Sequence, residues 1–399
     1  MKILYLSGLA SKAAIDDARH RYPQFSGYAA QKFNRLVAEG LAKNGQTVLA
    51  LSSFYLPKVG QFYNRKCETE CGVRYRYIPT LNNGLIRHLW LTAYCFVYVF
   101  FWGLFDKKEK AFVADILNIS ACMGAVAAAR IVGLRRVGIV TDMPGMRVSR
   151  GKTEKPEDNK QRDSFNTRMN KGFLDHFTHY VFLTEAMNEV LNPNRRPYIV
   201  MEGLVDDDVE INENSTKENK KVVIYAGGLH ERYGLRLLVE GFMKADVDNS
   251  ELWLYGNGPF AEELPEYHQR DARVIYKGIR PNDEVVEAEL KATLLVNPRP
   301  TREEFTRYSF PSKNLEYMAS GTPLLTTRLP GMPEEYYPYV FLFEEGETTD
   351  GYADAIRRVL TKPNEELLDK GTRARQWALS NKNNVRQTER IVELINVRY

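Results

Sequence analysis

Short runs of apolar residues alternate along the chain with longer stretches in which apolar residues recur every three or four positions. The short runs predict buried strands, and the longer stretches predict amphipathic helices. Between the first strand and Gly27 we expect a polar loop. In the first half, strands are expected at residues 3–6, 47–51, 73–78, 112–116, 137–140 and 180–183, and helices at residues 30–43 and 121–132.

A charged segment without apolar periodicity, residues 206–221, interrupts this pattern. A second series of strand and helix signals begins directly after it, which places a domain boundary near Val205. The second series predicts a strand from residue 222 that ends in paired glycines, strands at residues 252–255, 274–277, 294–297 and 323–327, and helices at residues 235–243 and 312–319.

The alternation of strands and helices in both halves predicts parallel, doubly wound sheets. We therefore expect an α/β protein of two Rossmann-like domains, residues 1–204 and residues 205–383, that face each other across a cleft. The tail has apolar residues at helical spacing and no strand partner of its own. It predicts a C-terminal helix, residues 384–399, that crosses back to the first domain.

Residues 89–105 differ from the rest of the chain because they carry no charge and are rich in aromatic side chains. Basic residues flank them, with Arg87 and His88 before and Lys107 and Lys108 after. At about 17 residues the stretch is at the short end of what crosses a bilayer. Three interpretations stay open, namely a fully buried helix, a helix on a membrane surface and a span, which is disfavoured because it would divide the first sheet.

Composition and charge narrow the class of protein. With 399 residues, 44% hydrophobic and 27% charged, the chain is long enough for two or three folded domains and is neither disordered nor fibrous. Its net charge of +4 is too small to indicate a nucleic-acid partner. The apolar run at the start is too short for a secretory signal. We expect a cytoplasmic protein, which the apolar segment could bring to the inner face of the membrane.

The sequence shows no strong metal-binding pattern. The cysteines lack the paired spacing of a zinc site, so reduced, incidental thiols are favoured over a redox or metal role. Two aspartate pairs have the spacing of metal ligands but lie in the linker and at a helix end, where we expect them to be solvated. No metal or other cofactor is therefore expected. The residues concerned are Cys67, Cys71, Cys95, Cys122, Asp206, Asp208, Asp246 and Asp248.

Ligands of parallel sheets bind beyond the carboxyl ends of the strands, so polar residues there are candidate site residues. Gly227 and Gly228 end a strand, and Arg232 precedes the next helix. This arrangement suits a phosphate, although an ordinary strand-to-helix turn would look similar. In the first domain Asp142 ends a strand, where it either acts in the site or satisfies a turn before Pro144.

The helix predicted at residues 312–319 follows a second strand of the second domain. Ser309 or Ser312 could cap it, its first amides could face an anion, and Lys313 and Glu316 would share one face. A carboxylate in that place can accept hydrogen bonds from two neighbouring ribose hydroxyls. The alternative is a capped surface helix with an ion pair between these two residues.

Taken together, these stretches resemble the second domain of glycosyltransferase family 4, which has the GT-B fold. The resemblance extends over nearly the whole chain and is looser in the first domain, where Gly27 matches the acceptor-side glycine loop. It rests on residues 227–235, the turn at residues 255–259, Lys277, Gly278, residues 182–185 and 202–206, and above all residues 310–323, Phe-Pro-Ser-Lys-Asn-Leu-Glu-Tyr-Met-Ala-Ser-Gly-Thr-Pro.

The resemblance implies a metal-independent, retaining transfer of a sugar from a nucleotide-diphosphate sugar, linked to UDP or GDP, to a saccharide or lipid-linked acceptor in surface polysaccharide or glycolipid synthesis. Glu316 would hold the donor ribose, and Gly278 would border the base. The remaining candidates for the donor are Gly227, Gly228, Arg299, Tyr308 and Ser309, with the backbone of Phe310, Pro311 and Ser312 at the diphosphate. The candidates for catalysis are Asp142, Arg232 and Lys313.

The chain departs from the family pattern at three places. Tyr308 stands where the family has a first glutamate, eight residues before Glu316, and Thr141 stands where a histidine commonly precedes the aspartate. The family's arginine and lysine of the glycine loop are also missing, so Arg232 with Lys313 or Arg299 would replace them. A sugar-nucleotide epimerase of the same fold and a non-catalytic nucleotide or sugar binder remain as alternative functions.

Overall fold

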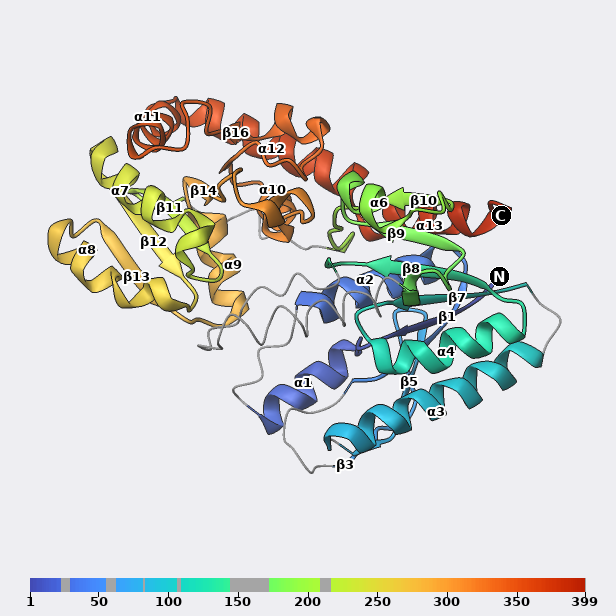
Figure 1. Cartoon of the computed structure of the whole chain (residues 1–399). Coiled ribbons are helices and arrows are strands. Elements are labelled where there is room, and N and C mark those ends of the chain that lie inside the picture. Colours follow the sequence, from blue (N-terminus) through green and yellow to red (C-terminus); the bar gives the residue numbers. More distant parts are fainter. Residues whose placement is uncertain are drawn as a thin grey trace, which may run out of the picture. The chain divides into compact units, whose positions relative to one another are not determined.

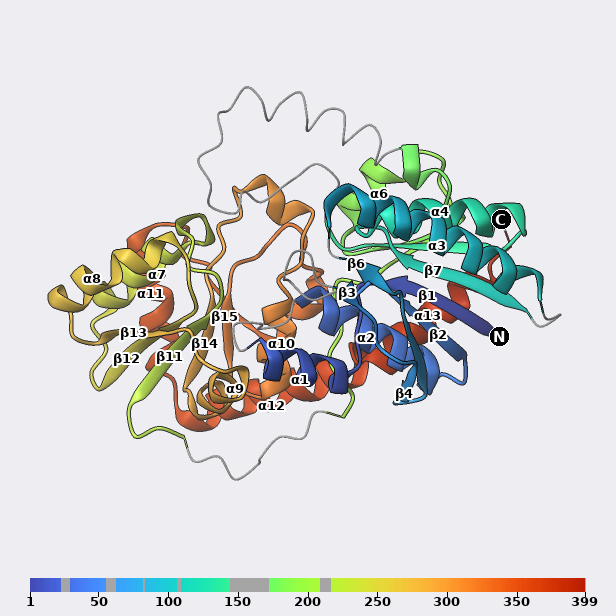
Figure 2. The same cartoon turned by 90° about the horizontal axis from the view of Figure 1, so that it is seen from below.

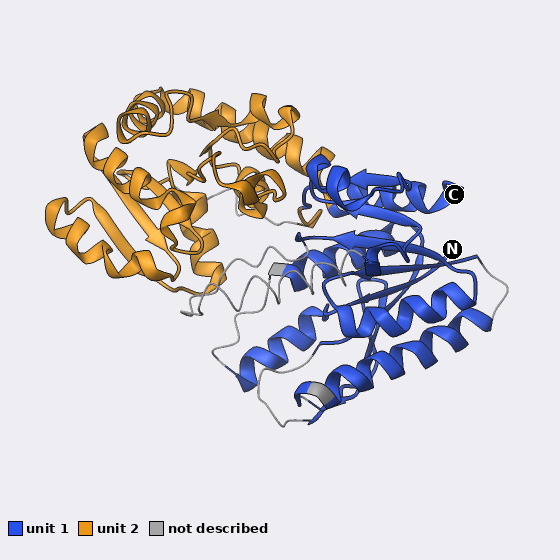
Figure 3. Ribbon diagram, viewed as in Figure 1, with its two compact units in different colours: residues 1–204, 384–399 blue, residues 205–383 orange. Residues whose placement is uncertain are grey.

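The computed structural model describes residues 1–22, 29–54, 62–81, 83–105, 109–143, 172–208 and 217–398. The chain divides into two compact units (Figure 3). The first comprises Met1–Leu204 together with Asn384–Tyr399, and the second comprises Val205–Asn383.

In the first unit, the described strands form a sheet in the order β10-β9-β8-β7-β1-β2-β5-β4. Neighbouring strands run parallel except β4 and β5, and β3 pairs with β6 in a separate antiparallel ribbon. Because β1 lies between β2 and β7, the strand order reverses there, and ligands of such sheets bind at this reversal. The strands are β1 (Lys2–Ser7), β2 (Thr47–Ser52), β3 (Phe62–Tyr63), β4 (Glu68–Glu70), β5 (Val73–Tyr77), β6 (Thr80–Leu81), β7 (Lys110–Asp115), β8 (Arg135–Val140), β9 (His179–Phe182) and β10 (Tyr198–Val200).

Helices cover both faces of this sheet, with α2 and α13 on one face and α3 and α4 on the other (Figures 1 and 2). The prediction of a polar loop after β1 was wrong, because the segment that follows β1 contains the helix α1. The Ser11 hydroxyl caps α1 by accepting a hydrogen bond from the Ala14 amide, and small alanines bury its inner face, so the apolar periodicity is weak. The helices are α1 (Lys12–Arg21), α2 (Ala29–Lys43), α3 (Gly84–Leu104), α4 (Ile119–Ile131), α6 (Glu185–Leu191) and α13 (Asn384–Asn396).

The C-terminal helix α13 belongs to the first unit, which confirms the predicted crossing. Ile391 and Ile395 lie in the same core cluster as Ile3 of β1. The side-chain amide of Asn44 at the end of α2 donates to the carbonyl oxygen of Val385 at 2.7 Å. A methyl group at Gly40 would lie 2.3 Å from the Asn384 carbonyl oxygen, so this glycine allows the two helices to pack closely.

The apolar segment forms α3, and the interpretation as a fully buried helix is wrong. Cys95 and Val99 face the core, whereas Leu89 and Phe101 on the opposite face are 64% and 50% exposed. At Gly124 of α4 a methyl group would clash with backbone atoms of α3, so the two helices touch closely. Within the described ranges, no helix is both long and apolar enough to cross a membrane.

The second unit contains a parallel sheet whose described strands have the order β13-β12-β11-β14-β15-β16. The strand order reverses between β11 and β14. Its strands are β11 (Lys221–Ala226), β12 (Ser250–Tyr255), β13 (Val274–Gly278), β14 (Leu294–Asn297), β15 (Leu324–Thr326) and β16 (Phe341–Leu342). Its helices are η1 (Glu231–Tyr233), α7 (Leu235–Ala245), η2 (Pro259–Glu262), α8 (Leu264–Arg270), α9 (Asn282–Lys291), η3 (Glu304–Arg307), α10 (Ser312–Ser320), η4 (Glu334–Tyr339), α11 (Thr349–Leu360) and α12 (Asn364–Asn381).

Candidate functional site

The predicted donor residues gather in the second unit, where β11 and β14 end. Helix α10 is fixed against both strand ends by buried hydrogen bonds. The Tyr317 hydroxyl accepts from the Ala226 amide at 2.9 Å and donates to the Ala226 carbonyl oxygen at 3.2 Å. The side-chain amide of Asn297 donates to the Asn314 side-chain oxygen at 2.6 Å. These contacts place the start of α10 beside the reversal of strand order, where a parallel sheet binds its ligand.

Glycines bring the loops of this site into backbone contact. Gly234, between η1 and α7, has φ +82°, and a methyl group there would lie 1.9 Å from the Pro298 carbonyl oxygen. Gly256 has φ +124°, and a methyl group there would lie 1.9 Å from the Gly227 carbonyl oxygen. Only glycine tolerates such an approach at a positive φ. The loop after β11 therefore touches both the loop after β14 and the loop after β12.

We expect Gly234→Ala to destabilise the second unit more than Gly278→Ala does. Both glycines have a positive φ, +82° and +73°, but Gly278 has open space where the methyl group would be placed. The difference isolates the clash with Pro298 and should be about 1–3 kcal/mol in the free energy of unfolding. Urea unfolding followed by the fluorescence of Trp253 and Trp377 measures it. Equal destabilisation by both substitutions would contradict this packing.

Arg232 and Arg299 form a cationic pair at the contact that Gly234 permits. The guanidinium carbons of Arg232 and Arg299 lie 5.3 and 5.0 Å from the Tyr233 ring centroid. They lie 5.8 and 5.9 Å from the ring centroid of Phe305. Burial, together with the nearby charge of Arg232, lowers the pKa of Arg299. Both guanidinium groups lie against the same two aromatic rings, and positive charges gathered in this way favour the binding of an anion.

Arg232 also has hydrogen-bond donors that the fold leaves unused. Its Nε and Nη2 atoms are buried, and neither has a hydrogen-bond partner among the described residues. An unpaired buried donor typically costs about 1–3 kcal/mol. Such a cost is usual where a ligand supplies the missing acceptor, and phosphate oxygens are the acceptors that a guanidinium group pairs with best.

Lys313 and Glu316 of α10 form the ion pair that their spacing predicted. The Lys313 Nζ lies 3.1 Å from a Glu316 carboxylate oxygen and 3.8 Å from a carboxylate oxygen of the buried Glu289. Burial opposes the charge of Lys313, but the two carboxylates outweigh burial and raise its pKa. The lysine thus stays charged, and it holds the Glu316 side chain, which is half-exposed, in a defined orientation.

The predicted cap of α10 was wrong. The N-cap residue is Pro311, and no side chain in the described part of the chain caps the helix. The Ser309 hydroxyl instead donates to the Phe305 carbonyl oxygen at 2.9 Å, and Ser312 is the first helical residue. The Phe310 ring packs on Tyr336, with the ring centroids 5.0 Å apart. A helix start without a side-chain cap keeps its first amides for another acceptor, such as a phosphate.

Other predicted donor residues lie near the same strand ends. Tyr308 follows η3, and the guanidinium carbon of Arg307 lies 5.9 Å from its ring centroid. The Gly228 carbonyl oxygen accepts from the Tyr225 hydroxyl at 2.9 Å. Gly278 ends β13, and its carbonyl oxygen accepts from the Gly256 amide at 2.9 Å. The turns after β11, β12 and β13 are thus connected at one edge of the sheet.

The predicted first-domain residues belong to the other compact unit. Asp142 follows β8 in the first unit, where partial burial raises the pKa of its carboxyl group and a hydrogen bond from the Met143 amide lowers it by a smaller amount. Gly27 and Pro144 lie outside the described residues. Of the predicted aspartate pairs, Asp206 and Asp208 come close together with Asp207 in an exposed turn.

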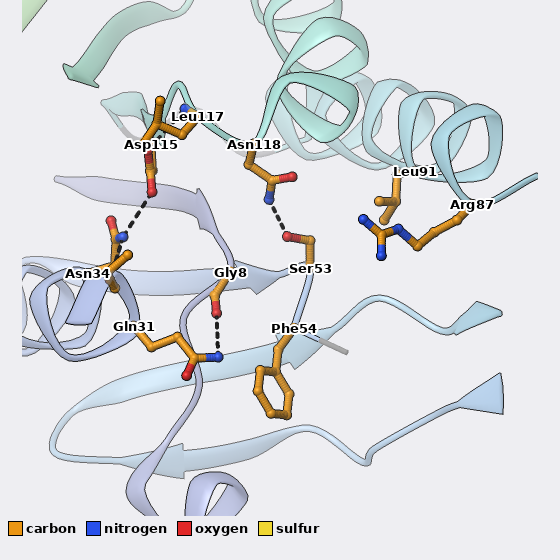
Figure 4. Close-up of a pocket in the computed structure, with 11 residues that line it drawn as sticks. Gly8, Gln31, Asn34, Ser53, Phe54, Arg87, Leu91, Asp115, Leu117 and Asn118 are labelled. Carbon is orange, nitrogen blue, oxygen red and sulfur yellow. Dashed lines mark hydrogen bonds between the residues drawn. The ribbon is translucent and has the colours of Figure 1, made fainter. Parts of the chain in front are cut away.

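A cavity that was not predicted lies at the reversal of strand order in the first unit (Figure 4). It has a volume of about 310 Å³. The cavity is lined by Asp115 at the end of β7, by Gly8 after β1 and by Ser53 after β2. Asn118, just before α4, and Asn34 of α2 line it as well.

Hydrogen bonds fix the polar side chains of this cavity. Asp115 accepts from the Asn34 side-chain amide at 3.0 Å and from the Leu117 backbone amide at 3.1 Å. The Asn118 amide donates to the Ser53 hydroxyl. Burial raises the pKa of Asp115, and the charge of Asp142 raises it further. Asp115 was missed from the sequence alone because it lies within an apolar run. A carboxylate at the end of a buried parallel strand is nevertheless a sign of a site residue, and this sign could have identified it.

The second unit matches a known family of enzymes. Residues 220–362, less than half of the chain, match the family described as "Glycosyl transferases group 1". No curated protein was found to be a sequence relative.

Solved structures resemble the chain over almost its full length. Sucrose-phosphate synthase from Thermosynechococcus elongatus has a TM-score of 0.65 at 13% identity, covering 99% of this chain and 98% of that one. HepE from Anabaena, in complex with UDP, has a TM-score of 0.60 at 15% identity, covering 98% and 99%. The lipopolysaccharide outer core galactosyltransferase WaaB, in its apo form, has a TM-score of 0.61 at 14% identity, covering 99% of each chain. These likenesses confirm the GT-B fold.

Proposed function

We propose that the chain is a retaining, metal-independent glycosyltransferase that moves a sugar from a UDP- or GDP-linked donor to a saccharide or lipid-linked acceptor in surface polysaccharide or glycolipid synthesis. The observation that carries the proposal is the pair of Arg232, which has two unused buried donors, and Arg299, together with the uncapped start of α10. The match over residues 220–362 and the UDP bound to HepE support this choice of ligand.

The demanding event of such a transfer is the departure of the nucleoside diphosphate. The bond between the anomeric carbon and the diphosphate oxygen breaks, and negative charge grows on the leaving oxygen. The acceptor oxygen then bonds to the same face of the anomeric carbon, and its proton passes to the departing diphosphate oxygen. Arg232, Arg299 and the first amides of α10 would stabilise the growing charge, and fixed donors of this kind usually make the largest contribution to catalysis.

Two carboxylates would position the reacting partners. Glu316 would accept hydrogen bonds from both hydroxyls of the donor ribose, with Lys313 holding it in place at 3.1 Å. Asp142 would orient the acceptor hydroxyl or the transferred sugar. Because two guanidinium groups supply positive charge at the diphosphate, the transfer would need no metal ion.

The outward face of α3 would place the first unit on a membrane that carries the acceptor. This face exposes apolar side chains, and exposed apolar patches with aromatic residues are typical of membrane-surface helices. On α4, which packs against α3, Met123 and Ile131 are exposed as well. The WaaB likeness supports an acceptor of lipid-linked type. The exposed side chains of α3 are Ile86, Leu89, Trp90, Val97, Phe101 and Leu104.

Binding of nucleoside diphosphates tests the proposed site. UDP or GDP at about 100 times its Kd should stabilise the protein by about 2.7 kcal/mol in a thermal-shift measurement. In Glu316→Gln the Kd should rise about 10- to 100-fold, because the ribose loses a charged acceptor worth about 1.5–3 kcal/mol.

Glu366→Gln is the matched control. Glu366, in the first turn of α12, forms an ion pair with Lys362, which precedes that helix, much as Glu316 pairs with Lys313. Glu366 lies outside the site. Its nucleotide Kd should equal that of the wild type. A wild-type protein that binds neither nucleotide, or Glu316→Gln with unchanged affinity, would remove the donor-site assignment.

A further inference from the structure

We infer that the cavity at the carboxyl ends of β1, β2 and β7 binds a phosphorylated saccharide, with the hydroxyl groups at Asp115 and the phosphate at Arg87. The identification of this ligand as the acceptor rests on the proposed function. The inference that it carries hydroxyl groups and a phosphate rests on the cavity alone. The phosphate belongs either to a sugar phosphate or to a lipid-linked sugar phosphate, and the experiment below distinguishes the two.

The lining has the composition of a sugar site. Amide and hydroxyl groups converge from separate elements, namely Gln31 and Asn34 from α2, Ser53 after β2 and Asn118 before α4. Phe54 adds an aromatic ring, on which the apolar face of a pyranose can pack (Figure 4). A volume of about 310 Å³ is at the small end of the range for ligand pockets and suits a single hexose better than an oligosaccharide.

The polar groups at the Asp115 end are already oriented. Asn34 accepts a hydrogen bond from the Tyr5 hydroxyl and donates both to the Ala30 carbonyl oxygen at 2.8 Å and to Asp115 at 3.0 Å. Asp115 accepts two protein hydrogen bonds, and a carboxylate has capacity for more. The carboxylate oxygens of Asp115 can therefore accept further hydrogen bonds from donors such as sugar hydroxyls, whereas their negative charge repels an anion.

The opposite end of the cavity has the opposite charge. Arg87 projects from α3 toward the cavity, across from Asp115 and Asn34 (Figure 4). A guanidinium group binds a phosphate through two parallel hydrogen bonds. A ligand that carries hydroxyl groups at one end and a phosphate at the other therefore matches both charges of the cavity.

The place of Arg87 in α3 connects this cavity to the apolar helix face. Arg87 and Leu91 line the cavity, while Ile86 and Trp90, in the same turns, belong to the exposed apolar face. A phosphate at Arg87 would thus lie where an isoprenoid or acyl chain could continue along α3. This continuity favours the lipid-linked source.

Calorimetric titration of the full-length chain with matched ligands tests the inference. The ligands are glucose, galactose, mannose and N-acetylglucosamine, each alone and as its 1-phosphate and 6-phosphate, and farnesol with farnesyl phosphate. In the wild type, at least one phosphorylated ligand should bind tenfold or more tightly than its unphosphorylated partner. A preference confined to farnesyl phosphate identifies the lipid source, and one confined to sugar phosphates identifies the soluble source.

Variants of Arg87 show whether this residue causes the preference for the phosphorylated ligand. Arg87→Gln should abolish it, and Arg87→Lys should retain part of it because the charge remains. Arg130→Gln is the matched control, since Arg130 is exposed on α4 and does not line the cavity. The inference is overturned if no ligand pair shows a preference, or if Arg87→Gln keeps the wild-type preference.

UDP titration of the same samples separates this inference from the proposed function. Unchanged UDP affinity in the Arg87 variants shows that the second unit is intact, and an unchanged circular-dichroism spectrum shows that the first unit, which carries Arg87, is folded. If the wild type binds UDP but shows no phosphate preference, only this inference fails. If it binds no nucleotide yet prefers a phosphorylated ligand through Arg87, the proposed function fails and the cavity assignment stands.

Discussion

Arg232→Met should lower kcat for sugar transfer by about 100-fold or more while leaving the free energy of unfolding unchanged or slightly higher. The loss in kcat is expected because the guanidinium group acts mainly on charge that develops as the diphosphate departs. The gain in stability is expected because the substitution removes buried Nε and Nη2 donors that have no partner in the described part of the chain. Opposite effects on activity and stability are typical of a residue kept for function.

Steady-state kinetics with the donor found by thermal shift, together with urea unfolding, measure both effects. Arg270→Met is the matched control, because Arg270 lies at the exposed end of α8 in the same unit and stacks on Tyr267. It should change neither quantity appreciably. Undiminished kcat in Arg232→Met, or a marked loss of stability, would show that Arg232 has a structural role instead.

The double substitution Leu89→Glu and Phe101→Glu should weaken binding to vesicles of phosphatidylcholine and phosphatidylglycerol by about 100-fold. Leu89 and Phe101 are 64% and 50% exposed on α3, so each would bury about half of its surface in the lipid. Full burial of such a side chain is worth about 1.5–3 kcal/mol, so half-burial of both gives about 1.5–3 kcal/mol, and the cost of bringing two carboxylates to the lipid surface raises the total to about 3 kcal/mol. A difference of about 1.4 kcal/mol is a tenfold change in affinity, so the loss is about 100-fold.

Vesicle flotation measures this binding, and brominated lipids report where the helix lies by quenching Trp90 and Trp102. Leu368→Glu is the control, because Leu368 is 50% exposed on α12 of the second unit. It should leave vesicle binding unchanged, and all variants should keep the wild-type affinity for UDP. A wild-type protein that does not bind anionic vesicles would refute the membrane face.

Much of the fold was predictable because strand signals are local. The apolar runs of both halves overlap β1, β2, β5, β7, β8 and β9 and strands of the second sheet, and none extends more than one residue beyond its strand at either end, apart from the paired glycines after β11. Their alternation with helices leaves few topologies. Lys313 and Glu316 were predictable as neighbours because residues three apart share a helix face. The α1 helix was missed because alanines rather than large apolar residues form its buried face.

The candidate sites were less predictable because they depend on residues far apart in sequence. Arg232 and Arg299 were separate candidates, and the backbone contact between Gly234 and Pro298 brings them together. The cap of α10 was assigned to serine, whereas the chain enters the helix through Pro311 and turns the Ser309 hydroxyl toward Phe305.

The sequence by itself determined the α/β class, the return of the C-terminal helix and the segment that carries the donor-site residues, because periodicity and short motifs act within a few residues. The tertiary structure alone decided which face of α3 is exposed, which arginines pair and which polar side chains enclose the cavity of the first unit. Those features depend on strand order and on close backbone approaches at glycines, and neither is encoded in local spacing.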